Sequence, residues 1–203
     1  MLDGVVRKRI DPILDAVGKR VAVLGITANS VTFAGLLIGL LAAFAIWQQA
    51  YWIGLVLLLL SRICDGLDGA IAKVTKITDF GGYLDIVFDF IFYGVIPLAF
   101  ILADPASNGV AGSVLIFSFY VNGSTFLAYA VMAEKRDMRS TMRGEKSIYF
   151  TTGLAEGTET IFVLSLFCVL PGSFPIIATI YAVICFYTAL SRIVLAARVF
   201  DRD

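Results

Sequence analysis

The feature that most constrains this sequence is a succession of long apolar runs with little polar chain between them. Hydrophobic residues make up 59% of the 203 positions and charged residues only 16%, well outside the balance of a water-soluble domain. A helix needs about 20 mostly apolar residues to cross a bilayer, which leaves room for about six such helices with short connections. We therefore expect an all-α integral membrane protein with membrane lipid as its surroundings.

The apolar runs predict six transmembrane helices. They are expected at Val31–Gln48, Tyr51–Val74, Asp79–Ala103, Gly109–Ala133, Ile148–Leu170 and Phe174–Val199. Residues 5–24 instead repeat apolar side chains at helical spacing, with basic side chains largely on other faces. This predicts an interfacial amphipathic helix over residues 1–25, ahead of a six-helix bundle over 29–199 in a single domain. The alternative for the first helix is a soluble cap on the bundle.

The predicted connectors differ in charge. Those at 48–50, 104–108 and 171–173 contain no Lys or Arg, whereas the N-terminus, 73–76, 135–146 and the C-terminal region hold every basic residue except Arg62. The positive-inside rule then predicts that both termini lie in the cytoplasm, which requires an even number of spans. Formal net charge is zero, so the totals give no support to a nucleic-acid partner.

Four aspartates interrupt the second and third predicted spans. The positions are Asp65, Asp68, Asp85 and Asp89. Spacings of three and four residues place each pair on one helix face, and the intervening turn lets the two helices run antiparallel and bring the pairs together near the cytoplasmic end. A charged side chain at the bilayer centre costs at least about 2.5 kcal/mol. With Arg62 and Lys73 as the local cations, these carboxylates need further partners.

Divalent metal ions are the partners that this donor set favours. The sequence contains no histidine, and oxygen ligands alone favour Mg²⁺ or Mn²⁺ over zinc. Two such ions would balance the carboxylates and suit phosphoryl chemistry, while Gly66 and Gly69 would open the helix surface to a nucleotide. Membrane salt bridges, a proton path or the ion site of a cation transporter are alternatives. They leave the glycines and the fixed spacing unexplained.

The run Asp65-x-x-Asp68-Gly69-x-x-Ala72-Lys73, followed by Gly81-x-x-x-Asp85-x-x-x-Asp89, resembles the signature of the CDP-alcohol phosphatidyltransferases. In one departure, Lys73 replaces the usual Arg, which keeps the charge but loses the bidentate fork. The resemblance implies six transmembrane helices after a juxtamembrane helix, and a homodimer. It also implies transfer of a phosphatidyl group from a CDP-linked lipid such as CDP-diacylglycerol to a small alcohol, with release of CMP.

The resemblance also implies roles for individual residues. Asp65 and Asp68 would bind a first metal ion, Asp85 would bridge two ions, and Asp89 would hold the second ion and act as general base. Gly69, Lys73 and Thr78 match family positions that touch the nucleotide and its phosphates. Asn29 and Thr32 resemble a short nucleotide-facing element before the first span; an ordinary helix N-cap is an equal explanation for Asn29.

The acceptor alcohol is less constrained. The run from Asp89 to Pro97 resembles the phosphatidylserine synthase branch. An ordinary membrane helix that contains Gly and Pro would explain the same residues. Glu156 and Glu159 share a helix face and would suit an amine, so we expect serine, ethanolamine or choline first. Structural ion pairs with Arg143, Lys146 or Arg192 are the competing explanation.

Other acceptors stay open. Glycerol 3-phosphate, inositol or inositol phosphate would need a basic pocket, which the run at 135–146 with Arg143 and Lys146 could supply. The plainer interpretation of this run is a positive-inside loop at anionic lipid heads. Phosphatidylglycerol, which would make the enzyme a cardiolipin synthase, is also compatible with the sequence.

Overall fold

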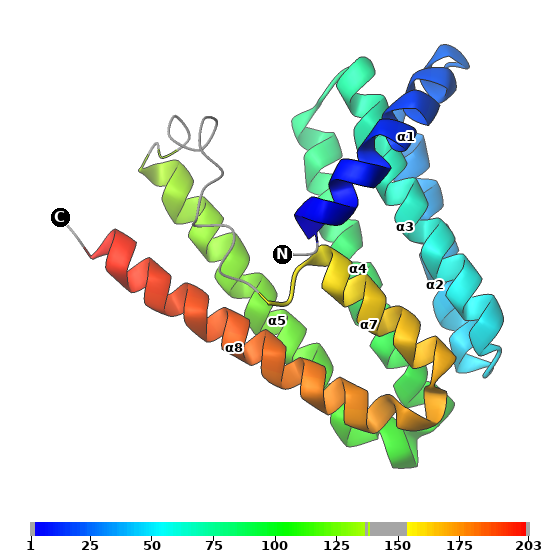
Figure 1. Ribbon diagram of the computed structural model, residues 1–203, viewed down its shortest axis with the longest axis vertical. Coiled ribbons are helices and arrows are strands. Elements are labelled where there is room, and N and C mark those ends of the chain that lie inside the picture. Colours follow the sequence, from blue (N-terminus) through cyan, green and yellow to red (C-terminus); the bar gives the residue numbers. More distant parts are fainter. Residues whose placement is uncertain (1–2, 137, 139–153, 202–203) are drawn as a thin grey trace.

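The computed structural model describes residues 3–136, 138 and 154–201, and Figure 1 shows that they form helices. In chain order the helices are α1 (Asp3–Val23), α2 (Ala28–Trp47), α3 (Tyr51–Val74), α4 (Asp79–Ala103), α5 (Pro105–Lys135), α7 (Gly157–Val169), the short 3₁₀-helix η1 (Pro171–Ser173) and α8 (Phe174–Phe200). No strand occurs in these described segments. The all-α prediction is confirmed.

The predicted spans are recovered unevenly. α3 and α4 have the predicted limits, and α5 and α8 extend slightly beyond theirs. α2 begins three residues before its predicted start and ends one residue before its predicted end. Within the described part of the chain, four helical segments are long and apolar enough to cross a membrane, namely 28–47, 79–103, 105–135 and 171–200. α3 is long enough but carries charged residues, and α7 has only 13 residues. The start of the predicted fifth span, 148–153, lies outside the described residues, so six spans stay a prediction.

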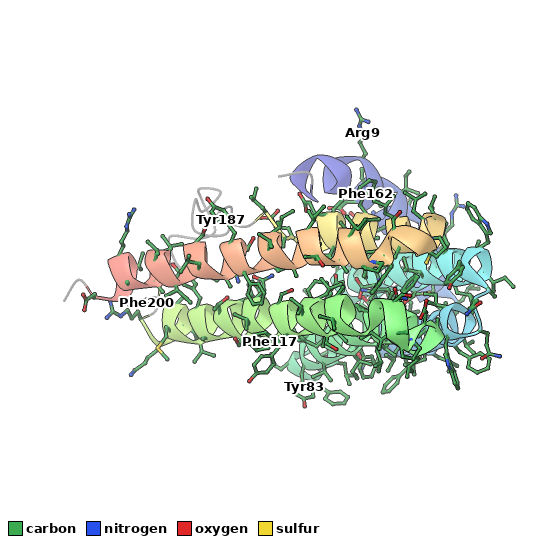
Figure 2. The ribbon with its side chains drawn as sticks, turned by 90° about the horizontal axis from the view of Figure 1, so that it is seen from below. Arg9, Tyr83, Phe117, Phe162, Tyr187 and Phe200 are labelled. Carbon is green, nitrogen blue, oxygen red and sulfur yellow. The ribbon has the colours of Figure 1, made fainter. Side chains whose placement is uncertain are left out.

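Large apolar side chains cover the outside of the bundle. Figure 2 shows Tyr83, Phe117, Phe162 and Tyr187 pointing outward, and each is more than half exposed. Apolar surface on this scale is unfavourable in water. It suits helices that are surrounded by lipid.

Helix α2 is the centre of the N-terminal half. It packs against both α3 and α4, whereas direct contact between α3 and α4 is slight. Close packing depends on small residues: a Cβ on Gly39 would lie 2.9 Å from the Phe92 ring, and the Ser61 hydroxyl donates to the Gly35 carbonyl oxygen at 2.8 Å. The backbones of α3 and α4 are therefore held apart, and side chains make the contacts between their acidic faces.

The C-terminal half is built on the pair α5 and α8, and α4 joins it to the rest. Aromatic rings fill the junction: Phe100 stacks on Phe174 with ring centroids 4.8 Å apart, and Phe167 meets Phe174 edge-on at 4.7 Å. In Figure 1, the α2–α3, α4–α5 and α7–α8 connections lie at the lower end of the molecule. The α3–α4 turn lies at the upper end, and the C-terminal ends of α5 and α8 lie at the left, away from the lower connections.

Side-chain caps define where several helices begin. Thr27 caps α2 by accepting from the Ser30 amide at 3.2 Å, and Thr78 caps α4 by accepting from the Gly81 amide at 3.0 Å. The N-cap explanation of Asn29 is therefore wrong, because Asn29 already lies inside α2. Asp104 caps α5, and hydrogen bonds from the Ser107 side chain and backbone hold the pKa of this exposed carboxyl below its ordinary value.

Helix α1 crosses α3 on the outside of the bundle (Figure 1). Its contact face carries Gly18, which is buried against Ala70, while Ile10, Ile13 and Val17 are exposed. The apolar side chains are thus divided between α3 and the outside. This division leaves the exposed apolar residues free for a membrane surface, and the interfacial position of α1 stays a prediction.

Candidate active site

The four aspartates lie on the facing helices α3 and α4. The carboxylates of Asp65 and Asp68 are each within electrostatic range of Asp85 and Asp89. Asp68 is only 6% exposed, and its Oδ2 atom has no hydrogen-bond partner among the described residues. The two predicted pairs therefore do come into one acidic cluster.

A guanidinium bridges this cluster between the two helices. Arg62 Nη1 lies 2.6 Å from Asp89 Oδ1 and 3.5 Å from Asp65 Oδ1. The guanidinium carbon is 3.7 Å from the centroid of the Phe92 ring, and Nη2 donates to the Ser61 hydroxyl at 3.3 Å. From the sequence, Arg62 was noted only as a nearby cation. Its spacing of three residues before Asp65 was the signal that it shares the acidic face.

The residues fit a hard divalent ion by their chemistry. The available ligands are carboxylate oxygens, and the buried Oδ2 atom of Asp68 accepts no hydrogen bond from the described residues. Among the described residues, no three acidic or thiol side chains converge on a single ion-sized point. The physical reason is that α3 and α4 stand apart and Arg62 lies between Asp65 and Asp89. Carboxylate rotations into the space are needed to close a coordination shell.

Two of the predicted nucleotide contacts come from the start of α2. Thr32 is buried beside Asp68 and lines a small cavity of about 10 Å³ together with Asp65 and Asp68. Asn29 lies beside the first turn of α4, since its Oδ1 atom would be 3.2 Å from a Cβ placed on Gly81. Gly81 is also the residue whose amide Thr78 caps. The sequence elements around 29 and 78 thus meet at one end of the acidic cluster.

The two glycines of α3 have different surroundings. A Cβ on Gly66 would lie 2.7 Å from Leu14 of α1, whereas nothing lies within 4 Å of a Cβ on Gly69. Packing against α1 is therefore enough to explain Gly66, and Gly69 is the glycine that faces open space. Lys73, one turn further on, lies 3.3 Å from Asp15 of α1 through its Nζ atom.

The predicted acceptor contacts form a second polar group. Glu156 is the N-cap residue of α7, and its charge acts on the half-buried Arg192 of α8. Arg192 Nη1 donates to the carbonyl and side-chain oxygens of Asn122 and to the Thr125 hydroxyl, at 2.9 to 3.0 Å. Glu159 lies in the first turn of α7.

Glu156 is thus within electrostatic range of Arg192, whereas the choice between a structural ion pair and an acceptor contact stays a prediction. The structure also adds Asn122 and Thr125, which sequence reasoning missed because α5 carries no acidic or basic signal near them. The predicted contacts Arg143 and Lys146 lie outside the described residues.

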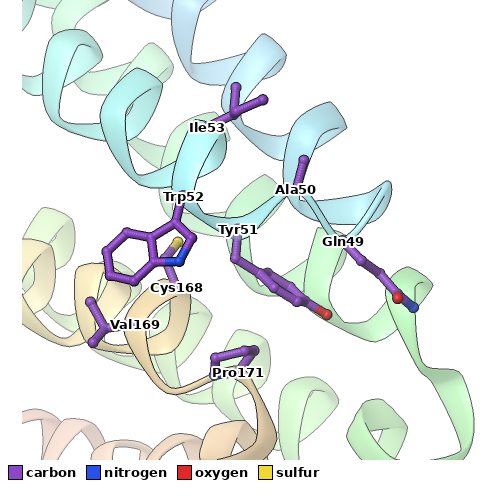
Figure 3. A pocket seen from close by; sticks show the side chains of 8 residues that line it. All are labelled: Gln49, Ala50, Tyr51, Trp52, Ile53, Cys168, Val169 and Pro171. Carbon is purple, nitrogen blue, oxygen red and sulfur yellow. The ribbon is translucent and has the colours of Figure 1, made fainter.

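A second cavity lies at the other end of the bundle. It has a volume of about 230 Å³ and is formed where the α2–α3 turn meets the end of α7. Figure 3 shows Gln49, Tyr51, Trp52, Cys168 and Pro171 around it. No carboxylate or basic side chain lines this cavity, so the chemistry belongs to the smaller acidic site.

Comparisons with known proteins place the chain in a known family. A family model for CDP-alcohol phosphatidyltransferase matches residues 25–200. Inner membrane protein YnjF of Escherichia coli is 42% identical over 193 residues, which cover 95% of this chain and 94% of that protein. Archaetidylinositol phosphate synthase of Pyrococcus horikoshii is 39% identical over 85 residues, which cover 41% of this chain and 45% of that protein.

The fold also matches a solved structure. The crystal structure of Mycobacterium tuberculosis phosphatidylinositol phosphate synthase with CDP-DAG bound has a TM-score of 0.71 and 18% identity, over 92% of this chain and 94% of that chain. The long apolar helices and the relation to an inner membrane protein show an integral membrane protein. The chain is a membrane enzyme that belongs to the CDP-alcohol phosphatidyltransferase family.

Proposed function

We propose that this enzyme transfers a phosphatidyl group from CDP-diacylglycerol, or a related CDP-linked lipid, to a small phosphate-bearing alcohol and releases CMP. The observation that carries the proposal is the acidic cluster, in which two aspartate pairs with the family spacing face each other from α3 and α4. The donor is supported by the solved relative of the same fold, which was crystallised with CDP-DAG.

The acidic cluster would hold two Mg²⁺ or Mn²⁺ ions. Asp65 and Asp68 would hold one ion, Asp89 would hold the other, and Asp85 would contribute to both. When bound, such ions neutralise the diphosphate and stabilise charge on the departing phosphate oxygen. Asp89 accepts the proton of the acceptor hydroxyl as that oxygen attacks the phosphorus of the diacylglycerol phosphate. The bond between this phosphorus and the oxygen that bridges to CMP then breaks.

Residues beside the cluster would bind the nucleotide part of the donor. Asn29 and Thr78 meet where α2 and α4 begin, and Thr32 lies next to Asp68. The open surface at Gly69 leaves room for a ligand against α3. Lys73 is the cation of the signature and would contact a phosphate, in competition with its bond to Asp15.

The acceptor that we propose is inositol phosphate, in place of the amino alcohol expected from the sequence. The relatives with named activities are an archaetidylinositol phosphate synthase and a phosphatidylinositol phosphate synthase, and no comparison supports serine. Within the chain, Arg192 supplies a guanidinium inside the C-terminal half. The charge of Glu156 acts on this cation. This interaction makes Glu156 a weaker candidate for binding the amine of a substrate.

We propose six membrane crossings, with α3 and the α7 region as the two that composition does not identify. The neutral connectors would lie on one side, and the acidic site, both termini and the basic connectors on the cytoplasmic side. Figure 1 supports this grouping, because the helix ends alternate between two ends of the molecule. The homodimer stays a prediction of the family resemblance.

A panel of acceptors tests the proposed reaction. The purified protein would be incubated with CDP-diacylglycerol and Mg²⁺, and CMP release would be measured with inositol phosphate, glycerol 3-phosphate, inositol, serine, ethanolamine, choline and phosphatidylglycerol. We expect release with inositol phosphate and a phosphorylated lipid product. Release with serine but not with inositol phosphate would refute the acceptor and leave the reaction class intact.

A further inference from the structure

A buried arginine stands among the aspartates without being part of the family signature. Arg62 has a side chain that is only 9% exposed, and it contacts one aspartate on each helix, Asp65 on α3 and Asp89 on α4. In the proposed site, these two carboxylates belong to different metal ions. The guanidinium therefore occupies ligands of both ions at once.

We propose that Arg62 is the internal counter-ion and positioning residue of the acidic site: it holds Asp65 and Asp89 across the gap between α3 and α4 before metal loading, and it gives up both carboxylates when divalent ions bind. The inference rests on the proposed two-metal function. It goes beyond that function in assigning Arg62 a place in the order of events at the site.

Charge and packing explain why an arginine is needed here. α3 and α4 make little direct contact, so unpaired carboxylates on their facing sides would repel each other without restraint. A guanidinium is long, planar and able to donate to two carboxylates. It offsets one negative charge of the four, whereas two divalent ions offset all four. The ions are therefore the better partners whenever they are available.

The surroundings of Arg62 allow its bonds to the two carboxylates to be replaced by bonds from those carboxylates to metal ions. Its guanidinium lies 3.7 Å from the centroid of the Phe92 ring and donates to Ser61 at 3.3 Å, and neither contact depends on the aspartates. Its Nε atom is buried and has no hydrogen-bond partner in the described part of the chain. The side chain is thus incompletely satisfied in the bridging position. The Phe92 ring can still hold the guanidinium of Arg62 through a cation–π contact after the carboxylates have bound metal ions.

Metal binding without turnover tests the exchange. Full-length protein in lipid nanodiscs would be titrated with Mn²⁺, with binding followed by the electron paramagnetic resonance signal of free Mn²⁺ and by the thermal unfolding temperature. The variants are Arg62→Gln and Arg62→Lys. Arg136→Gln serves as the control, because Arg136 binds the carbonyl oxygens of Val199 and Phe200 at the C-terminal ends of α5 and α8.

Loss of the competing cation should tighten metal binding. For Arg62→Gln we expect a lower unfolding temperature without metal and a half-saturating Mn²⁺ concentration lowered roughly tenfold or more, the scale of a charge-assisted hydrogen bond. Arg62→Lys should fall between this variant and the wild type, and it decides the question if Arg62→Gln does not fold. Arg136→Gln should keep the wild-type half-saturation.

Two negative outcomes have separate meanings. Equal half-saturating Mn²⁺ in the wild type and the folded Arg62 variants, or weaker binding in the variants, would overturn the role of Arg62. A wild-type protein that binds no Mn²⁺ would instead refute the proposed metal site.

Discussion

At the scale of single residues, the site combines carboxylates in unlike surroundings. Asp68 is buried with an unused oxygen, whereas the side chain of Asp89 is 31% exposed and receives a short hydrogen bond from Arg62. A general base must reach the acceptor hydroxyl, and the partly exposed Asp89 meets this need better than the buried Asp68. The sequence predicted the identity of these residues through their spacing, but it could not predict that an arginine would bridge them.

Replacing the proposed base tests this assignment. Asp89→Asn keeps the size and a metal-binding oxygen but cannot accept the proton, so we expect turnover to fall by about 10²- to 10⁴-fold while CDP-diacylglycerol binding persists. Asp104→Asn is the matched control, because Asp104 caps α5 away from the acidic cluster. Steady-state CMP release and donor binding would be measured for both variants. Undiminished turnover in Asp89→Asn would show that Asp89 is not the general base.

The acceptor assignment can be tested at Arg192. Arg192→Gln removes the cation beside Asn122 and Thr125, and we expect the KM for inositol phosphate to rise roughly tenfold or more, the value of a hydrogen bond to a charged group. The KM for the CDP-linked lipid should stay the same. Glu156→Gln, which removes the opposing charge, should not raise the acceptor KM. A raised KM in Glu156→Gln with none in Arg192→Gln would favour an amine acceptor instead.

At the scale of helices, much of the fold was predictable and the failures have identifiable causes. The limits of α3 and α4 follow from the apolar runs and from the Thr78 cap between them. α7 is shorter in the described residues than its predicted span, and its lack of a capping hydrogen bond left no clear start signal. The sequence could not predict that Gly66 packs against Leu14, because this contact joins residues far apart in sequence.

The packing of α1 on α3 leads to a stability prediction. A Cβ on Gly18 would lie 2.9 Å from Ala70 Cβ and 3.1 Å from the Ala70 backbone. Because backbone atoms cannot turn aside, Gly18→Ala should lower the free energy of unfolding by about 1 to 3 kcal/mol. Thermal unfolding in detergent would measure the change.

Gly69→Ala is the matched control for that measurement, since its Cβ would meet nothing within 4 Å. Alanine at this helical position should keep or raise stability by up to about 1 kcal/mol, while the KM for the donor rises if the nucleotide lies against Gly69. Equal stability of the Gly18→Ala variant and the wild type would show that α1 is not held against α3 by this contact.

At the scale of the whole molecule, the charge pattern predicted that the three connections without basic residues share a side, and these three connections lie together at the lower end in Figure 1. The sequence could not predict that α3 and α4 would each pack on α2 while leaving a space between them. That separation depends on the small residues of α2, whose partners lie on two different helices. Apolar periodicity shows which residues are buried, but not which neighbour buries them.

Membrane orientation provides a prediction at this scale. Single cysteines would be introduced by Ala106→Cys, in the first turn of α5, and by Asp201→Cys, directly after α8; both positions are exposed. The two cysteines should react with an impermeant maleimide from opposite sides. We expect Asp201→Cys to be labelled only from the cytoplasmic side of oriented vesicles. Labelling of both positions from one side would refute the even number of crossings.

The most direct test of the central claim is CMP release from CDP-diacylglycerol by the wild-type protein, with Mg²⁺ and inositol phosphate each added or withheld. Since the acidic cluster needs divalent ions and the reaction needs a nucleophile, we predict release only when metal and acceptor are both present, and none after chelation. Release that is unaffected by chelation, or no release from protein that is folded and binds both the CDP-linked lipid and inositol phosphate, would contradict a metal-dependent phosphatidyltransferase.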